Sequence, residues 1–191
     1  MANKADVDHV LTWSRQPHSL RKGFKISRQS ILPLDLRNAD LRDIDLSHLN
    51  FADDDLREVD LRGSLLNHSN LSDANLQSAW IEGVNLDDAT LISADLRKSN
   101  LSAASMRNAQ LFEADLQESL LDGAVLENAR AEGAQFRGCK LRNLRADRVD
   151  FSGAFFAKAL LTKASLQGAK LVATTFVGSA NVLARADKVI K

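Results

Sequence analysis

The fold is decided by a unit of five residues, which the stretch ADLRK-SNLSA at residues 94–103 shows twice. A large apolar residue returns at every fifth position from Leu36 to Phe176, which gives 29 consecutive central positions without a change of register. Only Ala131 and Ala146 fall short of a large side chain. A second residue, mostly Ala or Ser, lies two positions before each centre. Such a repeat has to be interpreted before secondary structure, because it determines the whole architecture.

A period of five fits neither regular element. On a helix five residues advance by about 500°, so the central residues would form no stripe, and on a strand they would alternate between the two faces. A chain that bends the same way once per unit places every centre in one core. All nine glycines share the phase two residues after a centre, which marks a corner with positive φ. Both prolines, Pro17 and Pro33, precede the ladder, as expected if backbone amides bond from coil to coil.

The pattern Ala-Asp/Asn-Leu-x-x resembles the pentapeptide-repeat proteins over about three quarters of the chain. The resemblance implies a right-handed quadrilateral β-helix with four five-residue sides per coil. We therefore expect an all-β solenoid, a right-handed quadrilateral β-helix of about seven coils, with short N- and C-terminal α-helical caps. The expected segments are an N-terminal cap with a short helix at residues 1–33, the β-helix at 34–178 and a C-terminal helix at 179–191.

Both ends need covers, because an open solenoid exposes its core and its strand edges. Apolar residues at helical spacing predict a short helix over residues 5–15, which caps the first coil or, alternatively, binds a partner. Residues 181–191 leave the five-residue register, and their apolar residues predict a helix that covers the last coil or forms a homodimer contact. Gyrase-binding proteins of the family it resembles dimerise through this end; a monomer with a simple cap is the alternative. The expected dimer contacts are Val182, Leu183, Ala186, Val189 and Ile190.

No catalytic constellation emerges, so we expect no enzyme, cofactor or metal site. The corner glycines leave no phosphate-binding loop, and no apolar run is long enough for a signal peptide or a membrane span. His48 and His68 lie one coil apart and are expected to stack as an exposed polar column, with a shared metal as the alternative. Cys139, the only cysteine, falls at a small inward position and is expected to be a buried apolar residue. A disulfide framework is excluded, which favours a reducing, cytoplasmic location.

The charge distribution carries more information than the net charge of zero. Residues 35–127 contain 19 acidic and 7 basic residues, a net charge of −12, whereas residues 130–170 contain 3 acidic and 9 basic residues, a net charge of +6. Spread over about 22 Å of rod, the acidic excess is one charge per about 1.9 Å, close to the ~1.7 Å of duplex DNA. Some members of the resembled family are gyrase-binding DNA mimics with strongly acidic surfaces. Against mimicry, arginines such as Arg42 interleave with the acids, and the ladder lacks the loop insertions on which several quinolone-resistance relatives rely.

Several outward positions carry groups that a partner could contact. Trp80, Leu120 and Leu160 share one side, and Ile92 and Phe112 lie on adjacent coils of the opposite side. We regard Ile92, Phe112 and Trp80 as the candidate partner contacts. The candidate acidic face consists of Asp40, Asp60 and Glu82. The buried Asp54 is expected to bond to nearby backbone at a corner.

These features favour a non-enzymatic protein-interaction scaffold, with no direct nucleic-acid binding and no membrane association. The alternative is a DNA-mimicking modulator of DNA gyrase or topoisomerase that confers drug or toxin protection. A continuous acidic stripe on one face would favour mimicry, and mixed charges would favour the scaffold.

Overall fold

The computed structural model describes residues 2–15 and 33–180, which form one helix, α1 (Lys4–Ser14), and a long coil. The helix expected over residues 5–15 is confirmed with bounds one residue earlier at each end. The predicted C-terminal helix, with all five of its dimer contacts, lies outside the described residues.

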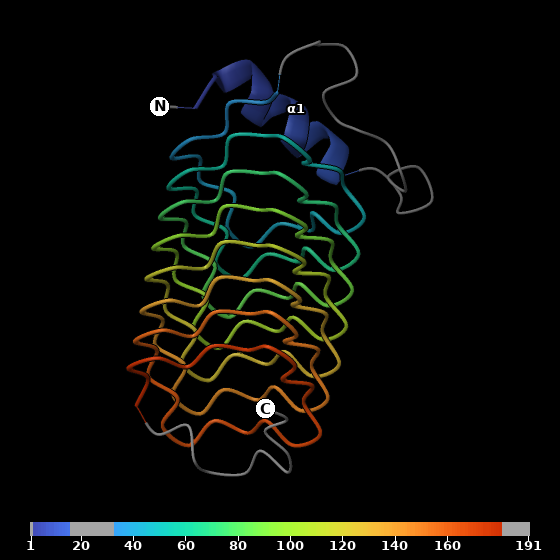
Figure 1. The fold of residues 1–191 in the computed structure, drawn as a ribbon. Coiled ribbons are helices and arrows are strands. Elements are labelled where there is room, and N and C mark those ends of the chain that lie inside the picture. Colours follow the sequence, from blue (N-terminus) through green and yellow to red (C-terminus); the bar gives the residue numbers. More distant parts are fainter. Residues whose placement is uncertain (1, 16–32, 181–191) are drawn as a thin grey trace.

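The coil repeats every twenty residues, which is four pentapeptides (Figure 1). Parallel β-bridges join residues twenty apart, from Asp35↔Asp55 to Leu160↔Ala180, and the bridged residue is always the one before a centre. Each bridge is isolated, because a turn follows within the same five-residue side. The β-structure of the described coil is therefore a set of single bridges stacked along the rod, without extended strands.

A tight turn closes every side of the coil. The amide of Ala39 donates to the carbonyl of Leu36 at 3.0 Å, and the same bond recurs along the ladder. The third residue of the turn has positive φ at every corner position from Asn38 to Gly178, and 21 of these residues are not glycine. Positive φ at this position is the property of a type II turn. The predicted corner phase is confirmed, but glycine is not required there.

The core consists of the two inward positions of each unit. Central residues are buried from Leu36 to Leu171, and the small residues two positions earlier are buried beside them; Leu96 and Ala94 are both 0% exposed. Near the C-terminal end the core becomes aromatic, where Phe136 stacks on Phe156 with ring centroids 4.6 Å apart. The prediction from the period of five, that the centre and the residue two positions before it face the core, is therefore confirmed.

Helix α1 lies across the N-terminal end of the coil (Figure 1). The side chain of Val10 is completely buried and belongs to the same core as the first coil. The amide of Asn3 donates to the carbonyl of Asp35 at 3.0 Å, and the amide of Asp35 donates to a carboxylate oxygen of Asp6 at 3.0 Å. The helix thus covers apolar surface and also binds backbone groups at the open edge, as a cap must.

Candidate protein-interaction surface

Where the residue before a centre is Asp or Asn, its side chain has a structural task on the outer surface. The side-chain oxygen of Asp35 accepts a hydrogen bond from the amide of Arg37 at 3.3 Å, and that of Asn50 accepts one from Ala52 at 3.0 Å. The same bond is made by Asp40, Asp45, Asp55, Asp60, Asn70, Asn75, Asn85, Asp95, Asn100, Asp115 and Asp150. Many of the acidic residues therefore serve as acceptors for turn amides, which is a structural reason for the acidic composition.

Where the residue before the centre is not Asp or Asn, a carboxylate of the neighbouring coil can accept the hydrogen bond from the turn amide. The amide of Arg142 donates to a carboxylate oxygen of Asp122, one coil earlier, at 2.8 Å. The amide of Gln167 donates in the same way to Asp147 at 3.1 Å. This role of the acids was not predicted, although the concentration of Asp and Asn directly before the centres is visible in the sequence.

Arginines bind the same carboxylates from two positions further along. Arg42 donates through Nε at 2.8 Å and through Nη2 at 2.7 Å to the two oxygens of Asp40. This bidentate pair lowers the pKa of Asp40 to about 2. The arrangement recurs in the pairs Asp35–Arg37, Asp55–Arg57, Asp60–Arg62 and Asp95–Arg97.

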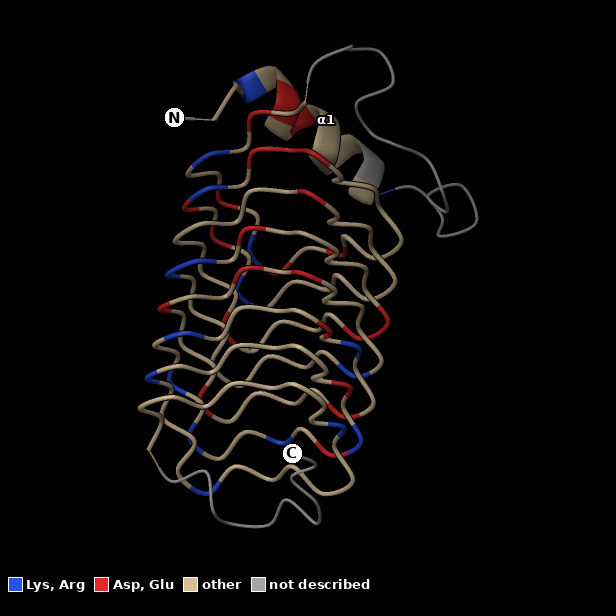
Figure 2. Cartoon of the chain, viewed as in Figure 1, with Lys and Arg blue, Asp and Glu red and all other residues tan. Residues whose placement is uncertain are grey.

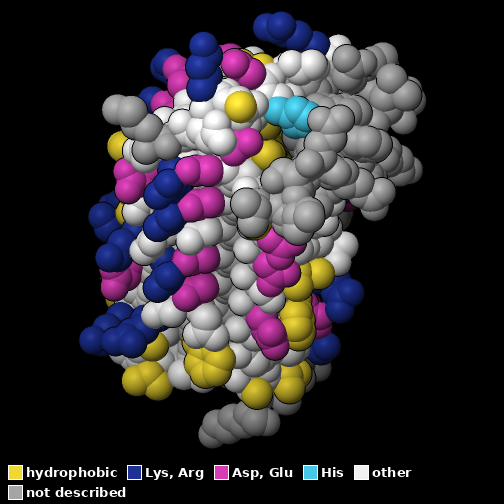
Figure 3. All heavy atoms as spheres, turned by 90° about the horizontal axis from the view of Figure 1, so that it is seen from above, with side chains coloured by type: hydrophobic (Ala, Val, Ile, Leu, Met, Phe, Trp, Pro, Cys, Tyr) yellow, Lys and Arg dark blue, Asp and Glu magenta, His cyan; other side chains and the backbone are white. Residues whose placement is uncertain are grey.

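The ion pairs also connect adjacent coils. Arg42 Nε lies 3.6 Å from a carboxylate oxygen of Asp60, so one guanidinium faces two stacked carboxylates. Glu82, on the same side, accepts a hydrogen bond from the Asn100 side chain at 3.3 Å. Two members of the candidate acidic face, Asp40 and Asp60, are therefore paired with arginine. Figure 3 shows basic and acidic side chains lying directly beside one another, and Figure 2 shows both signs on neighbouring coils.

Trp80 lies on this mixed-charge side and is 49% exposed. It is bridged to Asp60 on one coil and Asn100 on the other, and the guanidinium carbon of Arg62 lies 5.5 Å from its ring centroid. Asn100 is short, so a pocket of about 160 Å³ opens over it. The pocket is lined by Ser78, Ala79, Trp80, Lys98, Asn100 and Leu120. A shallow apolar recess with a polar rim can receive a single side chain of a partner.

Ile92 and Phe112 form a second, separate contact candidate. They lie on adjacent coils, where the amide next to Ile92, that of Ser93, donates to the carbonyl of Phe112 at 2.9 Å. Phe112 is 43% exposed and Ile92 is partly buried. The coil places this pair about half a turn from Trp80, so the three residues do not form one patch.

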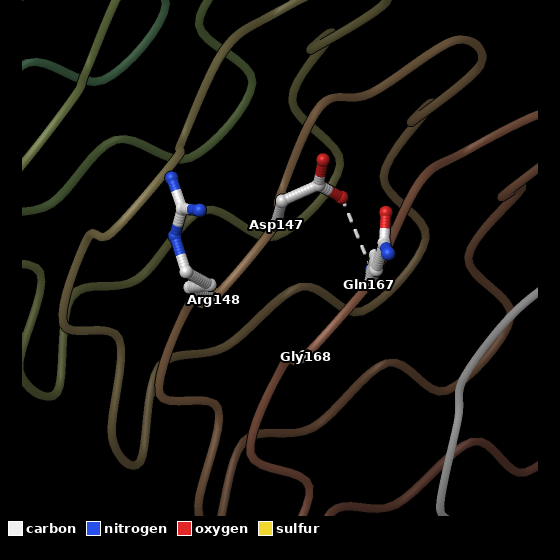
Figure 4. A pocket seen from close by; sticks show the side chains of 4 residues that line it. All are labelled: Asp147, Arg148, Gln167 and Gly168. Atoms are coloured by element: carbon white, nitrogen blue, oxygen red, sulfur yellow. Dashed lines mark hydrogen bonds between the residues drawn. The ribbon is translucent and has the colours of Figure 1, made fainter.

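A larger pocket of about 320 Å³ lies near the C-terminal end and is drawn in Figure 4. Its carboxylate, Asp147, already accepts hydrogen bonds from the amide of Gln167 and the hydroxyl of Ser165. Arg148 points away from Gly168 and donates to the side-chain oxygen of Asn128 at 2.8 Å. The polar groups of this pocket are thus committed to the coil itself.

The stacking of His48 on His68 and the burial of Cys139 agree with the predictions from the sequence. The rings of His48 and His68 stack with centroids 4.8 Å apart. Cys139 is buried, donates to the carbonyl of Leu116 at 2.9 Å, and has its pKa raised to about 11 by burial. Asp54 accepts a hydrogen bond from the amide of Leu34 at 2.9 Å. Within residues 2–15 and 33–180, no group of three or more His, Cys, Asp or Glu side chains converges as a metal site.

Four further apolar residues are exposed and were not singled out from the sequence. They are Leu65, Phe155, Val172 and Val177. Each occupies the position just before or just after a centre, which the repeat places on the outside. The phase of the repeat was therefore sufficient to find them.

Comparison with known proteins establishes the family. The model of pentapeptide repeats matches residues 35–73, 69–108, 104–143 and 147–178. This chain belongs to the pentapeptide repeat family. No curated protein sequence compared with it matches significantly.

The chain is similar in structure to several solved members of the family. HetL, involved in heterocyst differentiation regulation in the cyanobacterium Nostoc sp. strain PCC 7120, is 24% identical, with 80% of this chain and 91% of HetL covered and a TM-score of 0.42. QnrB1, a plasmid-mediated fluoroquinolone resistance protein, is 18% identical, with 73% and 76% covered and a TM-score of 0.43. A thylakoid-lumen protein of Arabidopsis thaliana is 20% identical, with 73% of each chain covered and a TM-score of 0.32.

α1, the helix in the described part of the chain, is too short and too polar to cross a membrane.

Proposed function

We propose that this chain is a non-enzymatic protein-interaction scaffold. The observation that carries the proposal is the composition of the outer surface, where acids are bound to turn amides and arginines while large apolar side chains stay exposed. Coil-to-coil hydrogen bonds hold these side chains in columns with a spacing of ~4.8 Å. A partner therefore meets a pre-organised surface and does not have to order it on binding.

The proposed contacts are Trp80 with its recess and, on the other side, the Ile92–Phe112 pair. Tryptophan and phenylalanine are enriched at protein interfaces, and a few such anchors supply most of the binding energy. A cytoplasmic location is part of the same prediction.

Affinity capture with matched variants tests the proposal. Full-length protein, Trp80→Ala, Phe112→Ala and the partly exposed control Ser102→Ala would each be immobilised and exposed to lysate of the source cell. Alanine already occurs at the control's position in other units, as Ala52 and Ala157. We expect a protein that the wild type and the control retain and that one of the two aromatic variants retains at least tenfold less. An identical set of captured proteins for all four baits would contradict the proposal.

The second candidate is a DNA-mimicking modulator of DNA gyrase or topoisomerase, which the net charge of −12 over residues 35–127 favours. The ion pairs of Asp40 and Asp60 weigh against it, because a guanidinium beside each carboxylate cancels the field that a phosphate mimic needs. Gyrase supercoiling assays decide between the two. Inhibition at micromolar protein that is abolished by reversing Asp40, Asp60 and Glu82 to lysine would establish mimicry. We expect unchanged supercoiling.

A further inference from the structure

One corner near the C-terminal end combines exposed apolar side chains with cations. Phe155 is bridged to Gln135 and Thr175 on the two adjacent coils, and Leu160 is bridged to Lys140 on the preceding coil. Phe155 and Leu160 themselves lie on consecutive sides of the coil. Lys158 occupies the corner between Phe155 and Leu160. We define the corner patch as Arg137, Lys140, Phe155, Lys158, Leu160 and Val177.

The cations of the corner patch differ from most other cations of the coil, although Lys98, Arg148 and Lys163 also form no ion pair with a described residue. Neighbouring bases pair with carboxylates: Arg142 with Asp122, Arg145 with Glu127 and Lys170 with Asp150. In contrast, Arg137, Lys140 and Lys158 have no carboxylate oxygen within 4.0 Å among the described residues. The patch therefore gathers three cations without an ion pair, whereas ten of the other thirteen lysines and arginines in residues 33–180 pair with a carboxylate.

The apolar part of the patch is exposed to a degree that allows contact. Phe155 is 44% exposed, Leu160 40% and Val177 71%. Gly138 and Gly178 occupy the same corner of the adjacent coils, so within residues 33–180 no side chain at that corner stacks on Lys158 from either coil. Apolar side chains surrounded by charged ones have the organisation of a protein interface, with an apolar centre and a polar rim.

We propose that the corner patch binds an acidic segment of a protein partner, in which an aliphatic or aromatic side chain is flanked by Asp or Glu. The proposal rests on the scaffold function and specifies the chemistry of one partner. Charge complementarity supplies the acidic residues, and Phe155 and Leu160 supply the surface for the apolar side chain.

Two other anionic ligands fit the patch less well. A nucleic-acid strand needs cations that track its backbone, but along the rod Leu160 follows Lys140 and Ala157 follows Arg137. A membrane surface needs apolar groups that enter the acyl region, but Phe155 and Leu160 are more than half covered by the coil.

A random twelve-residue peptide library displayed on phage, selected against the full-length protein, tests the proposal. We expect enrichment of acidic peptides that contain Leu, Ile, Phe or Trp. Lys140→Glu combined with Lys158→Glu should weaken binding of the selected peptide at least tenfold, and Leu160→Ala should weaken it several-fold. Arg148→Glu, which reverses an exposed corner cation about half a turn from Lys158, should change it less than twofold. Glu58, Glu113 and Glu118 already occupy corners with positive φ, so glutamate is compatible with the turn at Lys158.

The proposal is overturned if no acidic peptide is selected, or if the selected peptides bind the double variant as well as the wild type. It is also overturned if a fluorescent single-stranded DNA twelve-mer or phosphatidylserine vesicles bind the patch more tightly than the peptides do. Partner capture that depends on Trp80 or Phe112 but is unchanged in the double variant would leave the scaffold function intact and remove only this inference.

Discussion

At the scale of the residue, two positions of the unit determine the turn. The Asp or Asn before the centre accepts the next amide, as Asn50 does for Ala52, and the corner residue adopts positive φ. Asn and Asp are suited to the first task because their short side chains reach a backbone amide two residues ahead. The corner tolerates many residue types. Twenty-one of the corner residues adopt the left-handed conformation without being glycine.

A pair of glycines separates backbone strain from steric collision. At Gly83, with φ +67°, an added Cβ meets nothing within 4 Å, so Gly83→Ala should cost only about 1 kcal/mol for the left-handed conformation. At Gly63 the Cβ would lie 2.1 Å from a carboxylate oxygen of Asp43, which is the end of a flexible side chain and can rotate away, so Gly63→Ala should cost only slightly more than Gly83→Ala. Urea unfolding measures both. Asp43→Ala should bring Gly63→Ala to the level of Gly83→Ala, and a large cost at Gly63 that Asp43→Ala does not relieve would contradict this description of the corner.

The paired carboxylates predict how stability depends on pH. Arg37 and Arg42 lower the pKa of Asp35 and Asp40 to about 2, below the ~3.9 of an unfolded aspartate. A lowered folded-state pKa means that this stabilisation is complete above about pH 4 and is lost as the pH falls toward 2. The melting temperature should therefore be flat near neutrality and fall over this acidic range, with less dependence at high salt.

Asp40→Asn tests the cause of that fall, because asparagine keeps the acceptor for the turn amide and removes only the charge. It should make the decline between about pH 4 and 2 shallower. Glu113→Gln is the control, because Glu113 forms no ion pair with another described residue. If the melting temperature of Asp40→Asn falls with pH as steeply as that of the wild type and of Glu113→Gln, the arginine pairs do not stabilise the fold.

At the scale of the element, the five-residue side is the unit of stability. Its central side chain is buried, its amides bond to the next coil, and its turn closes on itself, as in the side centred on Leu96. At the N-terminal end of the rod, helix α1 takes the place of a further coil, because it covers apolar surface and binds backbone groups.

Removing one central side chain should show this dependence. Leu96 is completely buried, so Leu96→Ala should reduce the free energy of unfolding by roughly 2–5 kcal/mol. The partly exposed control Ser102→Ala, which removes one hydroxyl on the outer surface, should change it by less than about 0.5 kcal/mol. Thermal unfolding measures both variants, and equal melting temperatures would mean that the phase of the ladder is wrong.

The sequence predicted the inside and the outside of the coil, because a fixed period assigns each phase to one side. Leu96, Cys139 and the corner residues are where the period places them. The period of the sequence did not predict that Asp40 accepts a hydrogen bond from a turn amide or that it pairs with Arg42. Both contacts depend on the directions of amides and guanidinium groups within a turn. The exposed Phe155 was predictable from its phase, but its unpaired cationic neighbours required the three-dimensional arrangement of three coils.

At the scale of the whole molecule, the coil is a rod with different charge at its two ends. Acids predominate over residues 35–127 and bases over residues 130–170. Because ten of the sixteen lysines and arginines in residues 33–180 form ion pairs, the three unpaired cations that the corner patch brings together distinguish this part of the surface.

The predicted homodimer is tested by size exclusion with light scattering. If Val182, Leu183 and the apolar residues that follow them form a dimer contact, the full-length protein should have about twice its monomer mass. A chain that ends after Gly178 should be monomeric or aggregate, because it lacks both the contact and the cover of the last coil. A monodisperse full-length monomer at ~100 μM would exclude the dimer.

The central claim is that the surface of the rod binds another protein through exposed aromatic positions. Photo-crosslinking in the living cell tests it directly, with benzoylphenylalanine placed at position 80, at position 112 and, as the control, at position 102. We predict a crosslinked species of defined mass from position 80 or position 112 and none from position 102. No adduct from either aromatic position, or the same adducts from all three positions, would contradict the claim.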